Sequence, residues 1–117
     1  MGLTVPVEYG GAGVDTVCYS IVIEELSRVD ASTGLSVAAH NSLSMTPILL
    51  AGSEEQKKKY LPKLVSGELV SAIAMTEPGV GSDLQSVTTT ALKDGNGYRI
   101  NGAKTYISNG QIGRAHV

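Results

Sequence analysis

The sequence predicts an α+β fold in which helices come first and strands follow. Three observations predict this order: apolar residues at helical spacing after Asp15, a change of period after Gly67, and a hairpin signal at residues 94–97. Separate runs of helices and strands are typical of α+β folds, whereas parallel α/β folds alternate the two.

Three helical segments are expected before residue 53. The first follows Asp15, an N-cap candidate, and its apolar face is formed by Val17, Ile21, Val22, Ile23, Leu26 and Val29. The second covers about residues 31–41 and is rich in small side chains, which allow close packing or leave room for a ligand. The third runs from Met45 to Ala51 and ends at Gly52.

The fourth helix begins with the sequence Ser-Glu-Glu-Gln at residues 53–56, which is typical of a capping box. Ser53 is expected to cap the helix while Gln56 reaches back. The three lysines at residues 57–59 indicate a solvated face. Pro62 is predicted to end or kink this helix, because proline lacks the backbone N–H of a helix interior.

Three strands are predicted in the second half. Residues 70–75 form an apolar run typical of a buried strand. Residues 87–92 and 98–104 are predicted to be two further strands. Asp94-Gly95-Asn96-Gly97 between them is a hairpin signal.

Composition excludes several classes of function. The 117 residues suffice for one modest core, and 42% hydrophobic content is ordinary for a globular protein. A net charge of −2 gives no electrostatic argument for binding nucleic acid or an anionic membrane. Cys18 is the single cysteine, so no internal disulfide forms. With no signal peptide and no apolar run of roughly 20 residues visible, we expect a soluble intracellular protein.

Residues 74–83, with the sequence AMTEPGVGSD, are the most informative segment. An apolar run delivers a hydroxyl at Thr76, and a loop with glycines at 79 and 81 presents a second at Ser82. Glycine lets backbone approach a ligand closely, so the segment suits a flat, polar cofactor. Spacing alone favours a plainer interpretation, in which both hydroxyls stabilise a local turn.

Three segments resemble the acyl-CoA dehydrogenase family, in the family's order and spacing. They are residues 3–13 (LTVPVEYGGAG), residues 74–83, and residues 102–110 (GAKTYISNG). The resemblance implies that residues 1–68 belong to an N-terminal helical domain. Residues 69–112 would open a middle β-barrel domain.

The resemblance also implies that FAD is the cofactor. The position of Thr76 hydrogen-bonds the isoalloxazine ring in this family, and that of Ser82 contacts the cofactor beside the bound thioester. Tyr106 stands where the family commonly has Trp or Phe, and the Ser108 hydroxyl would approach the flavin's reactive nitrogen. The alternative for Tyr106 to Ser108 is an ordinary strand end before a turn. The cofactor-binding residues implied are Ile73, Ala74, Met75, Thr76, Gly81, Ser82, Tyr106, Ile107 and Ser108.

The second helix helps to form the acyl-chain pocket in the family. Its candidate substrate residues are Leu35, Ala39 and Leu43, with Ala38 and Asn41 beside them and Ser82 near the thioester. No catalytic residue is assigned, because the family's general base is a glutamate far downstream. Glu77 is expected to anchor its own loop. His40 is interpreted as a packed or solvated histidine, since no Cys/His/Asp cluster indicates a metal site.

The implied reaction is oxidation of the Cα–Cβ bond of an acyl-CoA to a trans-2-enoyl-CoA. Electrons would pass to an electron-transfer flavoprotein, and the full-length protein would be a homodimer or homotetramer in the bacterial cytoplasm or mitochondrial matrix. An acyl-CoA oxidase, a nitroalkane-oxidising flavoprotein and a non-catalytic helical/β module remain alternatives.

Family members are several times longer than this chain, so we expect an internal piece that by itself neither holds FAD tightly nor turns over. The last residues depart from the family pattern. Ile-Gly-Arg-Ala-His-Val matches one reading frame of a common short-read sequencing adapter. Residues 113–117 are therefore expected to be an artefact.

Overall fold

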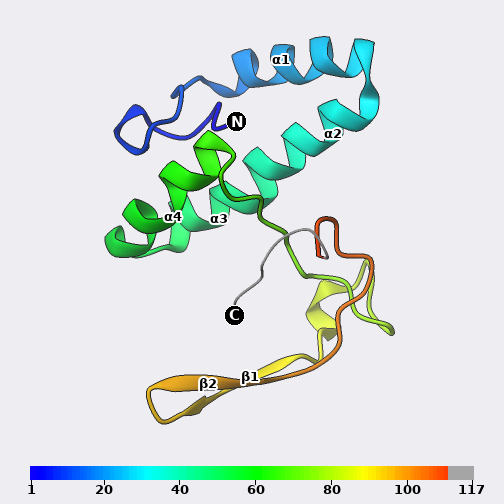
Figure 1. Cartoon of the computed structure of the whole chain (residues 1–117). Coiled ribbons are helices and arrows are strands. Elements are labelled where there is room, and N and C mark those ends of the chain that lie inside the picture. Colours follow the sequence, from blue (N-terminus) through cyan, green and yellow to red (C-terminus); the bar gives the residue numbers. More distant parts are fainter. Residues whose placement is uncertain (111–117) are drawn as a thin grey trace.

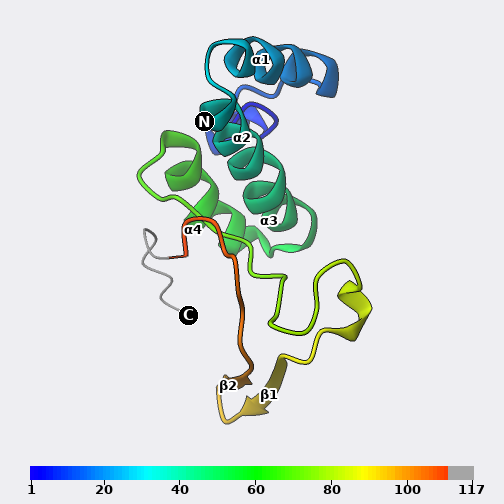
Figure 2. The same ribbon diagram turned by 90° about the vertical axis from the view of Figure 1, so that its right-hand side faces the viewer.

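A computed structural model describes residues 1–110 of the chain. Four α-helices come first and an antiparallel hairpin follows, which confirms the predicted α+β order (Figure 1). The radius of gyration is 15.7 Å, compared with about 13 Å for a compact domain of 100 residues. The hairpin projects away from the helices, which lengthens the molecule (Figure 2).

The first three helices follow local capping signals. Helix α1 (Thr16–Val29) begins as predicted, since the Asp15 side chain accepts a hydrogen bond from the Cys18 amide at 2.8 Å. Asp30 caps α2 (Ala31–Ala39) in the same way. A π-helical stretch (His40–Met45) then joins α2 directly to α3 (Thr46–Ala51), so the second and third predicted helices form one continuous rod.

Helix α4 (Glu54–Ser66) has the predicted capping box. The Ser53 hydroxyl accepts from the Gln56 amide at 3.2 Å, and the Gln56 side chain accepts from the Ser53 amide at 2.8 Å. The prediction that Pro62 ends this helix was wrong. The helix continues to Ser66 because Leu61 and Leu64, on either side of Pro62, are both buried in the core.

Replacing Ser53 with alanine is expected to lower the free energy of unfolding by about 1 kcal/mol. The substitution leaves the Gln56 amide without its acceptor. Urea denaturation followed by circular dichroism would measure the change. Ser36→Ala is the matched control, because the exposed Ser36 hydroxyl donates a hydrogen bond only to the Ser32 carbonyl of the same helix, α2. Equal losses in the two variants would contradict the capping role.

The hydrophobic core is small and lies between the N-terminal loop, the π-helical stretch and α4. Its five buried members are Val5, Tyr9, Met45, Leu61 and Leu64. Short 3-10 turns lie at Val7–Tyr9, beside this core, and at Leu84–Ser86. Helix α1 contributes no buried residue and packs on α2 where Gly34 meets Ser27, so close that an added Cβ would overlap the serine hydroxyl.

The first predicted strand does not form. Residues 70–75 have no regular secondary structure, and Val70 and Met75 are 40% and 38% exposed. An apolar run becomes a strand only when a neighbour supplies a hydrogen-bonding ladder. Within residues 1–110, no strand lies alongside this segment.

The other two strands form the predicted hairpin with shifted ends. Strand β1 (Thr90–Asp94) pairs antiparallel with β2 (Gly97–Asn101), and Asp94 lies opposite Gly97. Gly95 has a φ of 59°, as tight two-residue hairpin turns require. Both strands are exposed along their whole length. Residues 111–117, including the proposed artefact, lie outside the described part.

Candidate functional site

A cavity of about 200 Å³ lies where three distant parts of the chain meet. One wall comes from the end of α2 and the π-helical stretch, a second from residues 71–76, and a third from residues 106–109. Eight of the predicted site residues line it: Ala39, Leu43, Ile73, Met75, Thr76, Tyr106, Ile107 and Ser108. The structure therefore brings together most of the residues that the family resemblance selected.

Some predicted site residues lie elsewhere. Ala74, Gly81 and Ser82 do not line the cavity, and added Cβ atoms at Gly79 and Gly81 would meet nothing within 4 Å. Leu35 is 71% exposed on α2. Asn41 is fully buried, with its side chain bonded to the Leu3 amide and the Val37 carbonyl, so it has a structural role.

Backbone hydrogen bonds fix the loop that carries Thr76. The Thr76 carbonyl accepts from the Thr105 amide at 3.0 Å, which ties the loop to the segment leading into Tyr106. Glu77 and Val80 exchange two backbone bonds of 2.9 and 3.0 Å and close a tight turn. The Thr76 and Tyr106 segments are thus linked although they lie far apart in sequence.

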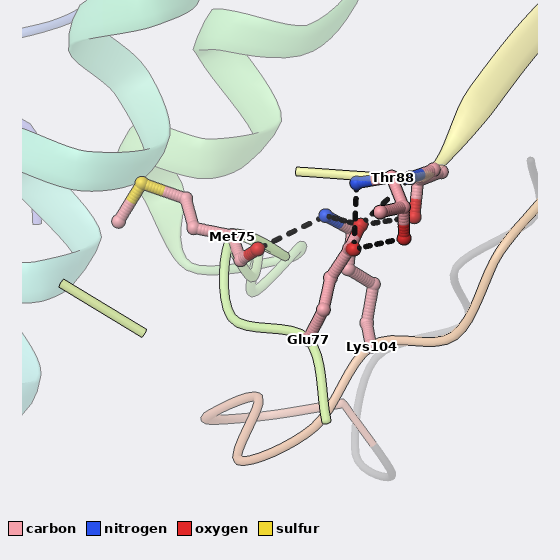
Figure 3. Close-up of polar contacts among 5 residues, drawn as sticks. Met75, Glu77, Thr88 and Lys104 are labelled. Carbon is pink, nitrogen blue, oxygen red and sulfur yellow. Dashed lines mark hydrogen bonds and ion pairs between the residues drawn. The ribbon is translucent and has the colours of Figure 1, made fainter. Parts of the chain in front are cut away.

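Glu77 is the most densely hydrogen-bonded side chain near the cavity. Its Oε2 accepts from the amide and the hydroxyl of Thr88 at 2.8 and 2.7 Å. Its Oε1 accepts from the amide of Thr89 at 2.9 Å, from the Thr89 hydroxyl, and from the Lys104 ammonium at 2.9 Å. Figure 3 shows Lys104 donating also to the Met75 carbonyl. The expectation that Glu77 anchors its own loop is confirmed.

This environment favours the ionised carboxylate. Hydrogen bonds from Thr89, Thr88 and Lys104 hold the pKa of Glu77 well below its ordinary value of 4.5. The side chain is only 4% exposed. A carboxylate that is so strongly stabilised and so thoroughly engaged is a poor proton acceptor, which argues against Glu77 as a general base.

The third wall contains two residues in an unusual backbone conformation. Tyr106 and Asn109 have φ angles of 54° and 64°, in the left-handed region that residues other than glycine seldom adopt. Asn109 is held there by a 3.4 Å bond from its side chain to the Ser71 carbonyl. Tyr106 is 92% exposed, so its ring presents a large apolar surface at the cavity mouth. Such conformations cluster at ligand-binding sites.

Four polar residues in the cavity wall were not predicted as site residues: His40, Ser44, Ser71 and Asn109. His40 was interpreted as a packed or solvated histidine, and it is packed, at 3% exposed. Its Nδ1 and the Oγ of Ser71 are buried without a hydrogen-bond partner among residues 1–110. Sequence gave no sign of Ser71, since a lone serine in an apolar run has no distinctive pattern.

Comparison with known proteins identifies the family to which the chain belongs. Residues 1–68 match the model of the N-terminal domain of acyl-CoA dehydrogenases, and residues 72–117 match that of their middle domain. The chain belongs to the acyl-CoA dehydrogenase family. An acyl-CoA dehydrogenase of Bacillus subtilis is 49% identical over 94% of this chain and 29% of its own length.

Solved acyl-CoA dehydrogenase structures agree with the fold. The crystal structure of acyl-CoA dehydrogenase from Geobacillus kaustophilus has a TM-score of 0.86 and 47% identity, covering 94% of this chain and 29% of that one. A glutaryl-CoA dehydrogenase from Mycobacterium smegmatis in complex with FADH2 has a TM-score of 0.91 and 36% identity, covering 97% and 29%. The chain therefore spans less than a third of the length of these relatives.

Other kinds of site find no support in the described part of the chain. Residues 1–110 contain no group of three or more His, Cys, Asp or Glu side chains able to hold a metal ion. None of their helices is long and apolar enough to cross a membrane. A second cavity of about 420 Å³, between α3 and α4, is lined by none of the predicted site residues.

Proposed function

We propose that this chain is part of an FAD-dependent acyl-CoA dehydrogenase that oxidises the Cα–Cβ bond of an acyl-CoA thioester to a trans-2-enoyl-CoA. The observation that carries the proposal is the cavity in which Thr76 and the Tyr106 to Ser108 segment meet the end of α2. An electron-transfer flavoprotein is the proposed acceptor. A homodimer or homotetramer in the bacterial cytoplasm or mitochondrial matrix is the proposed setting.

The residues present fit a flavin. Thr76 and Ser108 offer hydroxyls, while Met75, Ile107 and the exposed Tyr106 ring offer apolar surface. A flat ring with polar edges needs this mixture, since most small-molecule sites combine apolar walls with a few polar groups. Bound FAD would supply the two-electron acceptor for the oxidation. Of the other proposed cofactor residues, Ala74, Gly81 and Ser82 would contribute from the loop beyond the cavity wall.

The acyl chain is proposed to lie along the α2 side of the cavity. Ala39 and Leu43 line that wall, and both are small enough or apolar enough to contact a hydrocarbon chain. Leu35 and Ser82 do not line this cavity. They would contact the substrate only in the full-length protein, where further parts of the chain complete the pocket. The general base is proposed to lie outside this chain, because Glu77 is fully engaged.

The proposed boundary between the two domains lies between residues 68 and 69. Residues 1–68 would be part of the helical domain, and residues 69–112 would open the β-barrel domain. The cavity lies between these two parts, so each would contribute walls to one site. A ligand held there would be in contact with both.

The full-length protein tests this proposal. When purified, it is expected to be yellow and to lose its flavin absorbance when one of a series of acyl-CoA thioesters, from butyryl-CoA to palmitoyl-CoA, is added without oxygen. The member that bleaches fastest reports the preferred chain length. A colourless protein that binds no added FAD would refute the proposal, and rapid hydrogen peroxide formation in air would favour oxidase chemistry instead.

A further inference from the structure

The ring of His40 is held in one orientation. Its Nε2 lies 2.9 Å from the carbonyl oxygen of Leu64 in α4, and the side chain is 3% exposed. A carbonyl oxygen only accepts hydrogen bonds, so Nε2 carries the proton that is donated to it. In the neutral ring, Nδ1 is then an acceptor.

This acceptor is buried and has no hydrogen-bond partner among residues 1–110. His40 lines the cavity, and within residues 1–110 nothing donates to its Nδ1. Ser71 lines the same cavity, and its buried Oγ also has no partner there. Buried polar atoms are nearly always hydrogen-bonded, because an unpaired one pays the full cost of leaving water. Two such atoms in one cavity wall indicate that a bound group completes them.

The rest of the wall limits the nature of that group. Leu43, Ile73 and Met75 make the neighbouring surface apolar. A full anion or cation would be poorly solvated there. A neutral donor fits better: a hydroxyl can donate to Nδ1 and accept from the serine hydroxyl, whereas an amide N–H can donate to Nδ1 or to the serine oxygen.

We propose that His40 Nδ1 and Ser71 Oγ form a polar subsite that binds a neutral hydrogen-bond donor of the ligand, a hydroxyl or an amide N–H. This proposal rests on the proposed function, since both ligands invoked there carry such groups. FAD has ribityl hydroxyls and a ring N–H, and the pantetheine arm of coenzyme A has amide N–H groups. The shared chemistry is the donated hydrogen.

Nuclear magnetic resonance of the ring nitrogens distinguishes the two sources. In the full-length protein with labelled histidine, the Nδ1 signal of His40, identified by its loss in a His40→Gln variant, is expected to shift when a donor binds. A shift on adding FAD to the apoprotein assigns the donor to the flavin. A shift only on adding the acyl-CoA that bleaches the flavin assigns it to the thioester.

Substitution at Ser71 supplies an independent readout. Ser71→Ala removes the hydroxyl oxygen. It is expected to weaken binding of FAD or of the acyl-CoA, whichever shifts the Nδ1 signal, by about 2- to 10-fold, as for the loss of one hydrogen bond. Ser42→Ala is the matched control, because Ser42 is exposed, lies outside the cavity and bonds only to Ala38 in its own helix.

The outcomes separate the subsite from the proposed function. If the protein binds FAD and is bleached by an acyl-CoA while the Nδ1 signal never moves and Ser71→Ala binds normally, the subsite is refuted and the function stands. If it binds neither FAD nor any acyl-CoA, both proposals fail.

Discussion

Replacing Leu61 with alanine is expected to lower the free energy of unfolding by about 2–5 kcal/mol, the usual cost of emptying a buried leucine site. Leu61 is 0% exposed and packs with Val5, Met45 and Leu64 in a core that has five buried apolar residues among residues 1–110. A core this small has few neighbours able to move into the space. The loss is a large part of the roughly 5–15 kcal/mol that stabilises a typical domain.

Urea denaturation at constant temperature measures the change in the free energy of unfolding. Two further variants serve as controls. Leu50→Ala makes the same substitution in a helix at a residue that is 83% exposed, so it should change stability by less than about 0.5 kcal/mol. Leu61→Met keeps the volume and should cost less than about 1.5 kcal/mol. The core is wrongly assigned if Leu61→Ala and Leu50→Ala behave alike. If Leu61→Ala does not fold, the Leu61→Met variant still tests the burial.

The helices and the hairpin could be predicted because their signals are local. Asp15 and the Ser53/Gln56 pair act within three residues of the helix starts that they mark. The Asp-Gly-Asn-Gly turn likewise fixes the pairing of β1 and β2 without help from elsewhere. Caps and tight turns satisfy backbone groups over a few residues, so a short stretch of sequence contains the whole cause.

Strand limits could not be predicted, because distant groups set them. The predicted start of the second strand, at residue 87, was wrong since the Thr88 and Thr89 amides donate to the Glu77 carboxylate instead of to a strand. The predicted end at residue 104 was also wrong: the ladder ends at Asn101, and Lys104 donates to the same carboxylate. No pattern in residues 87–104 indicates either contact.

The candidate site, too, was predictable only in part. Family resemblance selected Thr76, Tyr106 and Ser108, and the structure places all three on one cavity. The polar pair of His40 and Ser71 is visible only in three dimensions, because it depends on a bond from His40 to a carbonyl 24 residues away. Neither residue type is distinctive by itself.

Replacing Glu77 with glutamine is expected to release the loop that carries Thr76 from the hairpin. The carboxylate accepts five hydrogen bonds, two on Oε2 and three on Oε1. Glutamine has the same shape but replaces one oxygen with an NH2 group, which would face at least two other donors. Hydrogen-exchange protection of the Thr88 and Thr89 amides should fall by about 10- to 100-fold, as expected for losing hydrogen bonds to a charged group.

Asp94→Asn is the matched control, since it makes the same carboxylate-to-amide change in the exposed Asp94–Arg99 pair on the hairpin. An exposed ion pair contributes little, so protection at Thr88 and Thr89 should stay as in the unchanged chain. Comparable losses in both variants would mean that Glu77 has no special part in holding the loop.

The pH dependence of the same amides gives Glu77 a second, independent test. Its pKa is lowered in the folded protein, so its contribution is fully present above the ordinary value of 4.5 and is lost progressively as the pH falls from there through the lower folded value. Protection at Thr88 and Thr89 should therefore still be partly retained one pH unit below 4.5, where an ordinary glutamate is mostly protonated, and Glu77→Gln should show no such dependence. Protection that disappears near 4.5 would show that the carboxylate is not stabilised as its contacts indicate. If it persists, Glu77 holds the Thr76 loop, the hairpin base and Lys104 together as an ionised acceptor. That role is incompatible with proton transfer, and it leaves the chemistry of the site to other residues.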